Sequence, residues 1–306
     1  MTDIAEPLVS VIIPTYNRAQ LVRESIASVL DQTYRNFELI VADDGSTDGT
    51  VASLRSLTDA RVKTIALDHT GNAARTRNRA VVQARGPWIA FLDSDDLWLP
   101  AKLELQLGAL RAAPQCGWSC TGFAFIDANG TLVPQRAGLP YRAYSGWILE
   151  RILTFEAAAS IQTLMMRRTL LDAVGGFDEA FVFNPDYDLE LRLAARSEIC
   201  ALPDCLTLIR SHDGRQSDAA GAAALFASSA RVFRKARMVA TSDVIRDICT
   251  RQCATQLAAR ARALSKTGQH VAAFASISDA MREAPFQRDV WRALANCSRH
   301  LLAARA

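Results

Sequence analysis

Three carboxylates stand within four residues in the segment Asp93-Ser94-Asp95-Asp96, directly after the apolar run 88–92. Like charges repel, so a fold keeps such side chains together mainly where a cation or a network of hydrogen-bond donors neutralises them. Mg²⁺ and Mn²⁺ prefer carboxylate oxygens and often also hold the phosphates of a substrate. Capping of the following helix would explain one aspartate but not all three. The segment therefore predicts a site for a divalent cation.

Two further polar clusters have side chains that suit a nucleotide. Segment 43–49 is rich in Asp, Gly and Ser and follows the apolar run 37–42. Its carboxylates can accept hydrogen bonds from a base or from ribose hydroxyls, but such runs are equally common as turns and helix caps. Arg75 and Arg79 share one helical face, which suits either a diphosphate or a solvated surface. The residue types alone leave both alternatives open for each cluster.

The elements that must position these clusters alternate in type. Strand-like runs are expected at 8–13, 37–42, 62–66 and 88–92, and helices between them at 21–30, 51–57 and 73–84. This alternation predicts an α/β fold with a mostly parallel sheet, in which loops at the carboxyl ends of the strands carry the ligands. A helix at 103–111 and a strand at 118–126 follow, and then a mixed α+β region that extends to residue 209.

The last part of the chain has a different pattern. From residue 219 onward Ala, Leu and Arg recur at helical spacing without a strand signal. We therefore expect a catalytic domain over residues 1–218 and an all-α appendage over residues 219–306. Stretch 261–285 has the pattern of one tetratricopeptide-like helical repeat. A plain helical bundle is an equal alternative, because a stable stack normally needs at least three repeats.

Charge is distributed unevenly along the 306 residues. Residues 219–306 contain 14 Lys/Arg and 5 Asp/Glu, a net charge of +9, so residues 1–218 carry −6 within the total of +3. The acidic part suits a divalent cation. The basic tail suits peripheral contact with an anionic membrane surface, a polymer or a partner protein, or consists of solvated helix faces. No nucleic-acid partner is expected.

Composition and the amino terminus set the expected compartment. Half of the residues are apolar and 22% are charged, as in a globular protein. The start has no signal-peptide pattern and no apolar run is long enough to span a bilayer, so the cytoplasm is expected, with the inner face of the membrane as a peripheral alternative. The seven cysteines form no CxxC pair, which favours reduced, buried thiols over a zinc site.

Taken together, the motifs resemble those of family-2 glycosyltransferases of the GT-A fold. Segments 10–18, 43–48, 77–78 and 93–96 read SVIIPTYNR, DDGSTD, RN and DSDD, in the order and spacing of that family, and the likeness extends over about residues 8–217. The resemblance implies a Rossmann-like GT-A fold. It also implies transfer of a sugar from a nucleoside-diphosphate sugar, with UDP as the expected nucleotide, to a glycan or lipid-linked acceptor. The expected transfer inverts the anomeric centre and serves polysaccharide, glycolipid or glycoprotein glycan synthesis.

The resemblance also assigns residues to the donor site. The matching positions are Pro14, Thr15, Tyr16, Arg18, Asp43, Arg77 and Asp93. Among them Arg77 belongs to the family's A-R-N element, in which Thr76 here replaces the usual alanine. Asp93 matches the ribose-side acid of the DxD motif, and Asp95 matches the ligand of its Mn²⁺ or Mg²⁺.

Two downstream elements complete the resemblance. Asp186 matches the family's catalytic base, and Pro185 stands where the family usually has Glu. A structural role of Asp186 as a helix cap is compatible with this position. Arg210-Ser211-His212 resembles the R-x-H element that closes the donor site, so His212 is expected to contact the metal or the diphosphate.

Two other functions would require sequence features that differ from those of this chain. A sugar-phosphate nucleotidyltransferase should have a Gly-rich loop after the first strand, where this chain has residues 14–18, PTYNR. A degenerate transferase that only recruits partners through its helical tail should have lost acidic motif residues, and Pro185 is the only such departure in the sequence. The sequence discloses neither the sugar nor the acceptor, linkage, pathway or oligomeric state.

Overall fold

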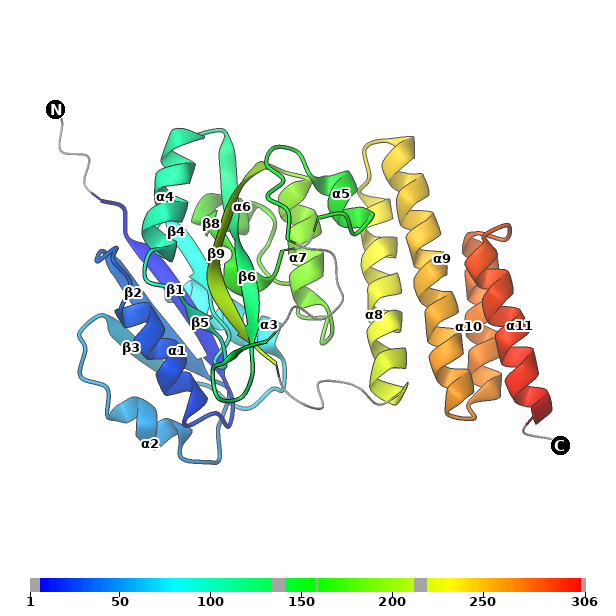
Figure 1. Ribbon diagram of the computed structural model, residues 1–306, viewed down its shortest axis with the longest axis horizontal. Coiled ribbons are helices and arrows are strands. Elements are labelled where there is room, and N and C mark those ends of the chain that lie inside the picture. Colours follow the sequence, from blue (N-terminus) through cyan, green and yellow to red (C-terminus); the bar gives the residue numbers. More distant parts are fainter. Residues whose placement is uncertain (1–5, 134–140, 158, 212–218, 304–306) are drawn as a thin grey trace. The chain divides into compact units, whose positions relative to one another are not determined.

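The computed structural model describes residues 6–133, 141–157, 159–211 and 219–303 (Figure 1). In this part of the chain nine strands form one sheet, in the order β3-β2-β1-β4-β8-β6-β9-β5, with β7 paired to β6. The strands are β1 (Val9–Thr15), β2 (Phe37–Asp43), β3 (Val62–Ala66), β4 (Trp88–Phe91), β5 (Leu97–Trp98), β6 (Cys116–Ile126), β7 (Leu132–Val133), β8 (Met165–Arg167) and β9 (Glu198–Arg210).

The sheet has a parallel half and a mixed half. Strands β3, β2, β1 and β4 are parallel, which confirms the predicted alternation. Beyond them β8 is antiparallel to both β4 and β6, and β9 is parallel to β6 but antiparallel to β5. Thr15, Asp43 and Ala66 are register partners at the ends of the first three strands. The loops after these strands therefore begin at one edge of the sheet.

Helices cover both faces of the parallel half. They are α1 (Leu21–Leu30), α2 (Thr50–Arg55), α3 (Ala73–Val82) and α4 (Lys102–Ala112), and α5 (Leu149–Leu153), the 3₁₀ turn η1 (Ile161–Thr163), α6 (Arg168–Ala173) and α7 (Pro185–Ala194) follow. Alternate residues of a strand point to opposite faces. The odd-numbered residues of β1 accordingly pack with apolar residues of α1 and α4 in one buried core, which contains Val9, Val11, Ile13, Val22, Ile26, Leu103 and Leu107.

The chain divides into two compact units. The first comprises residues 1–149, 156–180 and 192–212, and the second comprises 150–155, 181–191 and 213–306. The second unit contains α8 (Ala219–Met238), α9 (Asp243–Lys266), α10 (His270–Glu283) and α11 (Arg288–Ala303). Helix α8 begins at the predicted start of the appendage. The domain boundary itself and the tetratricopeptide character of 261–285 stay predictions.

The long helices of the second unit pack through small side chains. Gly268, with φ of 74°, turns the chain between α9 and α10. The buried face of α9 contains Cys249, Cys253, Ala254, Ala258 and Ala261. Such side chains let neighbouring helices approach closely. None of the helices in the described ranges has the length and apolar character needed to span a bilayer.

Candidate functional site

The predicted donor residues of the first two strands lie side by side at the sheet edge. Thr15 and Asp43 are register partners, and both are buried. The Asp43 carboxylate accepts hydrogen bonds from the Ser46 backbone N–H at 3.0 Å and from the Ser46 hydroxyl. The Thr15 hydroxyl is buried and has no hydrogen-bond partner among the described residues. Buried polar atoms are rarely left unpaired, so this hydroxyl indicates a place that a ligand or water completes.

Asn17 ties the loop after β1, which begins with Tyr16, to the loop after β2. Its backbone N–H donates to the Ser46 hydroxyl at 2.8 Å, and its side-chain oxygen accepts from the Thr47 backbone N–H at 2.8 Å. The backbone N–H of Arg18 donates to the Thr50 hydroxyl at 3.0 Å. The two loops that carry the predicted donor residues are therefore mutually positioned without a ligand.

Asp44 ties the loop after β2 to the loop after β3. Its buried carboxylate accepts hydrogen bonds from the Thr70 backbone N–H at 3.1 Å, from the Thr70 hydroxyl at 3.0 Å and from the Gly71 backbone N–H at 2.9 Å. Asp44 thus holds loops together, a role that segment 43–49 did not reveal in the sequence.

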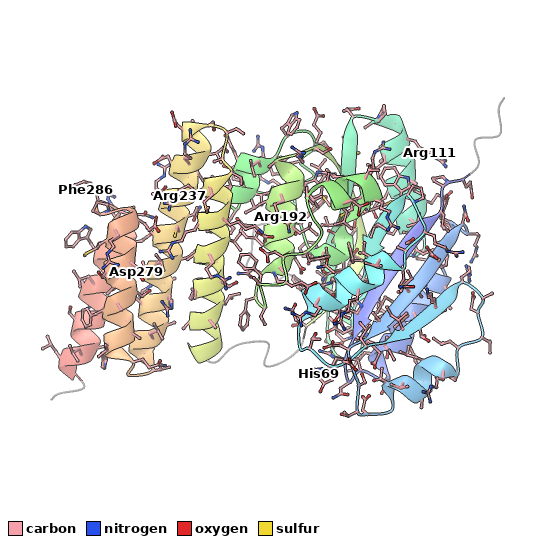
Figure 2. The ribbon with its side chains drawn as sticks, turned by 180° about the vertical axis from the view of Figure 1, so that it is seen from behind. His69, Arg111, Arg192, Arg237, Asp279 and Phe286 are labelled. Atoms are coloured by element: carbon pink, nitrogen blue, oxygen red, sulfur yellow. The ribbon has the colours of Figure 1, made fainter. Side chains whose placement is uncertain are left out.

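Tyr16 and His69 form an aromatic pair at the same edge. Their ring centroids are 4.2 Å apart with an interplanar angle of 22°, and Tyr16 remains 40% exposed (His69 is labelled in Figure 2). The His69 Nδ1 lies 2.8 Å from the Asp44 carbonyl oxygen. Gly45 is required beside it, because a Cβ there would lie 2.8 Å from the His69 backbone nitrogen. His69 was missed in the sequence, since no motif surrounds it.

The acidic segment after β4 does not form one cluster. Asp93 pairs with Arg77 at 2.6 Å, and Asp95 pairs with Arg18 at 3.0 Å. The fully buried Asp96 accepts hydrogen bonds from other parts of the chain, namely from the Gln162 amide and the Arg210 backbone N–H, both at 2.8 Å. The three carboxylates therefore have three different sets of partners: an arginine for Asp93, another arginine for Asp95, and uncharged N–H donors for Asp96. Asp96 therefore has a structural role, whereas the assignments of Asp93 to the ribose and of Asp95 to the metal stay predictions.

Arg210 positions the backbone of the acidic segment. Its Nε donates to the Asp95 carbonyl at 3.0 Å, and a terminal nitrogen pairs with Glu24 at 2.7 Å. The Arg210 side chain is buried. The sequence pattern predicted no separate role for Arg210, although this residue is the first of the R-x-H element. His212, the expected metal ligand of that element, lies outside the described residues.

The residues present fit a metal only together with a phosphate ligand. Within the described ranges no group of three His, Cys, Asp or Glu side chains could hold a metal ion. Mg²⁺ commonly takes one or two protein carboxylates and completes its shell with substrate phosphates and water. The buried Asp95 carboxylate meets this requirement, and the adjacent Arg18 suits phosphate oxygens.

Helix α3 is anchored by Glu179. Arg75 pairs with the Glu179 carboxylate at 2.9 Å, and the Asn78 side chain donates to it at 3.0 Å. These hydrogen bonds lower the pKa of Glu179. Arg75 is thus engaged by a carboxylate, whereas the buried Arg77 faces Asp93. Arg77 is therefore the arginine of α3 that lies against the acidic segment, as expected for the residue assigned to the sugar donor.

Asp186 lies in the first turn of α7 and belongs to the second compact unit. The two acidic residues that follow it on α7 are differently engaged. Asp188 is buried and pairs with Lys235 of α8 at 2.8 Å. Glu190 is buried, and burial raises its pKa well above the usual value, with the negative charge of Asp186 as the second cause.

Left-handed backbone conformations occur near the residues predicted for the donor site and for the catalytic base. Outside glycine, the described residues include three with positive φ, namely Asn17 (49°), Phe155 (60°) and Asn184 (59°). Asn17 lies in the donor loop, and Asn184 precedes Asp186 by two positions. Phe155 stacks on Tyr187 with a centroid distance of 5.8 Å. Such conformations cost about 1–3 kcal/mol each and concentrate at functional sites.

Replacing Glu190 with glutamine should change the pH dependence of stability. The unfolded chain loses this proton near pH ~4.3, whereas the folded protein keeps it to higher pH. The contribution of Glu190 to the free energy of unfolding should therefore fall as pH rises above about 4.3, so the wild type should lose stability relative to Glu190→Gln over that range. Urea denaturation at several pH values measures both curves. Glu150→Gln, at an exposed position, is the control, and parallel wild-type and Glu190→Gln curves would contradict the buried neutral carboxyl.

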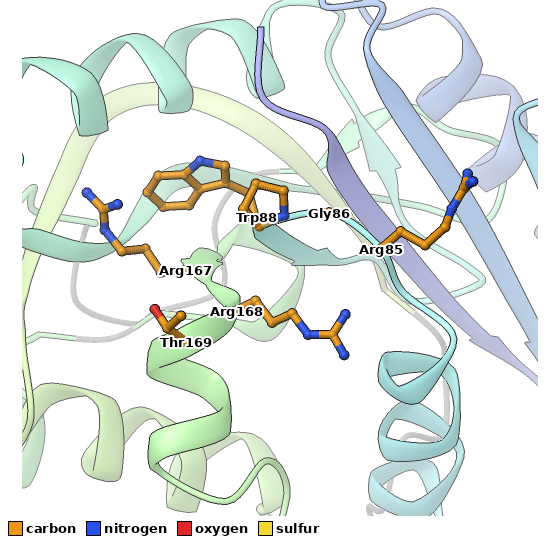
Figure 3. Close-up of a pocket in the computed structure, with 7 residues that line it drawn as sticks. Arg85, Gly86, Trp88, Arg167, Arg168 and Thr169 are labelled. Carbon is orange, nitrogen blue, oxygen red and sulfur yellow. The ribbon is translucent and has the colours of Figure 1, made fainter. Parts of the chain in front are cut away.

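An open pocket of about 360 Å³ lies at the other end of β4 (Figure 3). It is lined by Arg85, Gly86, Pro87, Trp88, Arg167, Arg168 and Thr169. Its cationic groups are engaged by the protein: Arg85 pairs with Glu38 at 2.8 Å, and the Arg167 guanidinium lies 4.7 Å from the centre of the Trp88 ring. Trp88 is the first residue of β4, whereas the predicted donor residues lie at or after the carboxyl ends of the strands. None of those residues lines this pocket.

Comparisons with known proteins match both the motifs and the fold. A family model described as Glycosyl transferase family 2 matches residues 10–172. WfgD of Escherichia coli, a UDP-Glc:alpha-D-GlcNAc-diphosphoundecaprenol beta-1,3-glucosyltransferase, is 33% identical over 195 residues, which cover 64% of this chain and 73% of WfgD. The family-model match contains segments 10–18, 43–48, 77–78 and 93–96, which carry the motifs.

Two solved structures resemble the chain over most of its length. S. aureus TarS 1–349 in complex with UDP-GlcNAc has a TM-score of 0.72 at 21% identity, covering 90% of this chain and 81% of that chain. The mannosyltransferase PcManGT from Pyrobaculum calidifontis, in complex with GDP-Man and Mn²⁺, has a TM-score of 0.61 at 21% identity, covering 98% of this chain and 81% of that chain. The likenesses confirm the expected fold.

Proposed function

Because the chain belongs to glycosyl transferase family 2, we propose that it transfers a sugar with inversion from a nucleoside-diphosphate sugar to an acceptor hydroxyl in polysaccharide synthesis. The observation that carries the proposal is the set of groups at the carboxyl ends of β1, β2 and β4, all within the matched residues. Thr15 and Asp43 are register partners there, and Asp93 and Asp95 follow β4.

We propose a UDP-sugar as the donor. WfgD is described as using UDP-Glc, and the TarS structure contains UDP-GlcNAc. In this chain the unpartnered Thr15 hydroxyl and the Asp43 carboxylate can bond to a base, and Arg77 holds Asp93 ready for ribose hydroxyls. Pro14, Tyr16 and Arg18 belong to the same loop and are assigned to the donor with them.

Asp95 would hold Mn²⁺ or Mg²⁺ together with the diphosphate of the donor, and His212 is proposed as a further ligand. A Mn²⁺ complex of PcManGT supports this choice of metal. When bound, the metal neutralises negative charge on the leaving nucleoside diphosphate. Arg18, 3.0 Å from Asp95, adds a cation that can bond to the same phosphates.

Asp186 is the proposed catalytic base. It takes the proton of the acceptor hydroxyl as that oxygen bonds to the anomeric carbon, while the bond from this carbon to the diphosphate oxygen breaks on the opposite face. A single displacement of this kind inverts the anomeric centre. Asp188 is less suited to the role because Lys235 pairs with it, and Glu190 because its side chain is buried away from an acceptor.

The proposed acceptor is a glycan or a lipid-linked sugar. The WfgD acceptor is described as alpha-D-GlcNAc-diphosphoundecaprenol, a sugar on a lipid diphosphate. Family membership leaves the acceptor sugar and the linkage open, because side chains outside the donor loops decide them.

A screen of nucleotide sugars tests the proposed function. With Mn²⁺ present, a donor at about 100 times its Kd should add about 2.7 kcal/mol to the free energy of unfolding and raise Tm. UDP-glucose, UDP-N-acetylglucosamine and GDP-mannose form the panel, and each nucleoside monophosphate is the matched control. A donor that raises Tm should also be hydrolysed slowly to the nucleoside diphosphate. Failure of every nucleotide sugar to change Tm or to be hydrolysed would contradict the proposal.

A further inference from the structure

Large apolar side chains are exposed at one end of the helical array in the second unit. They are Met238, Val239, Val244, Phe286 and Trp291, which we call the tip surface. Phe286 is 94% exposed and Met238 is 85% exposed. Single exposed apolar residues are ordinary, but a group of them at one place marks an interaction site.

An ion-pair cluster shows that the tip residues share one end of the array. Glu283, at the end of α10, pairs with Arg234 at 2.8 Å and with Arg237 at 2.5 Å, both near the end of α8. The connections 239–242 and 284–287 therefore lie beside each other. Figure 2 labels Arg237 of α8 and Phe286, in the connection between α10 and α11, toward the same end of the helices.

Hydrogen bonds hold the tip surface in shape. The Trp291 indole N–H donates to the Pro285 carbonyl at 2.8 Å. Arg246 donates to the Ala240 carbonyl at 2.7 Å, and the Ser242 hydroxyl caps α9 by accepting from the Ile245 backbone N–H at 3.2 Å. The apolar side chains thus project from ordered connections, which lowers the entropy that binding must remove.

The tip surface lies among cations on a positively charged segment. Four exposed arginines flank it, namely Arg246, Arg282, Arg288 and Arg292, and residues 219–306 carry a net charge of +9. Three of the four pair with a nearby carboxylate on the same helix: Arg246 with Asp243 at 2.8 Å, Arg282 with Asp279 at 2.9 Å and Arg292 with Asp289 at 3.8 Å. The net charge of the segment nevertheless attracts anionic surfaces within a Debye length.

We propose that the tip surface docks on an anionic lipid bilayer. Aromatic and aliphatic side chains that project from the ends of helices, with arginines around them, suit the boundary between headgroups and acyl chains. The indole of Trp291, with its polar edge already bonded, suits the same depth. This docking is independent of the donor chemistry, although it would bring the protein to the location of a lipid-linked acceptor.

Vesicle flotation of the full chain tests the proposal without any sugar donor. The parent should bind vesicles of phosphatidylcholine with phosphatidylglycerol, and bind them more weakly as salt rises or phosphatidylglycerol is omitted. The double variant Met238→Ser/Phe286→Ser should bind about tenfold more weakly, because two apolar side chains no longer enter the bilayer. Both side chains are exposed, so the fold and Tm should be kept.

Val271→Ser is the matched control, because Val271 is 88% exposed but lies in the first turn of α10, at the opposite end of the array. It should bind vesicles like the parent. Equal binding by the double variant and the parent would overturn the proposal, and so would equal losses in the double variant and the control. If the parent does not bind vesicles but self-associates, and the double variant is monomeric, a second copy of the chain covers the tip surface and the proposal is wrong.

Discussion

Replacing Asp186 with asparagine should lower the turnover of sugar transfer by roughly 10²–10⁴, the range typical for loss of a general base. Asparagine has nearly the same size but cannot take up the acceptor proton. Donor affinity should hardly change, because the acceptor side is affected and the donor contacts are not. Steady-state kinetics at saturating donor, with calorimetric titration of UDP, separates the two effects.

Glu190→Gln is a sharp control, because it lies one turn along the same helix and replaces a buried carboxyl, whose pKa burial raises, with an uncharged amide of the same shape. Its turnover should stay close to that of the parent. If Asp186 only stabilises the first turn of α7, in which it is the second residue, asparagine should cost about 0.3–1 kcal/mol of stability and turnover should survive. Turnover of Asp186→Asn within a few-fold of the parent would therefore exclude the base role, and Asp188 would be tested next.

Replacing Asp95 with alanine should abolish measurable transfer and remove the effect of Mn²⁺ on the binding of UDP. If Asp95 holds the metal, calorimetry of the variant should give the same UDP affinity with and without Mn²⁺, whereas Mn²⁺ should strengthen binding to the parent. The fold should persist in metal-free buffer, because Asp96 and not Asp95 bonds to Gln162 and to the Arg210 backbone.

The alternative role of Asp95 is to position Arg18, with which it pairs at 3.0 Å. In that case Asp95→Ala should weaken UDP binding by the same factor with and without Mn²⁺. Continued strengthening of UDP binding by Mn²⁺ in the variant would refute the metal assignment. Asp68→Ala, at an exposed position after β3, removes one negative charge from another loop and should leave both titrations unchanged.

Local patterns were sufficient to predict the parallel half of the sheet. Each of its strands is a short apolar run that ends in polar residues, and these patterns lie within a few residues of each other. The row formed by Thr15 and Asp43 follows from this alternation, because parallel strands end at one edge. The mixed half was harder to predict, since β8 contains three residues and β5 only Leu97 and Trp98. Runs this short have no recognisable periodicity.

The different roles of the aspartates could not be predicted from the sequence, because each role depends on hydrogen-bond donors that lie far away along the chain. The Asp44 carboxylate accepts a hydrogen bond from Thr70, 26 residues away, and the Asp96 carboxylate accepts one from the backbone N–H of Arg210, 114 residues away. In the sequence these aspartates are indistinguishable from their neighbours Asp43 and Asp95. Only the folded arrangement shows which carboxylates accept hydrogen bonds that join distant segments, as Asp44 and Asp96 do.

The ties made by Asn17 and Asp44 limit how such a protein can diverge. Because each side chain joins two loops, an insertion or a substitution in any one of them disturbs the others, and its effects will not be additive with changes there. Mutational tolerance should accordingly be low in 15–18, 43–50 and 69–72. New specificities in descendants of this gene should then arise by variation elsewhere, with the interlocked loops inherited as one module.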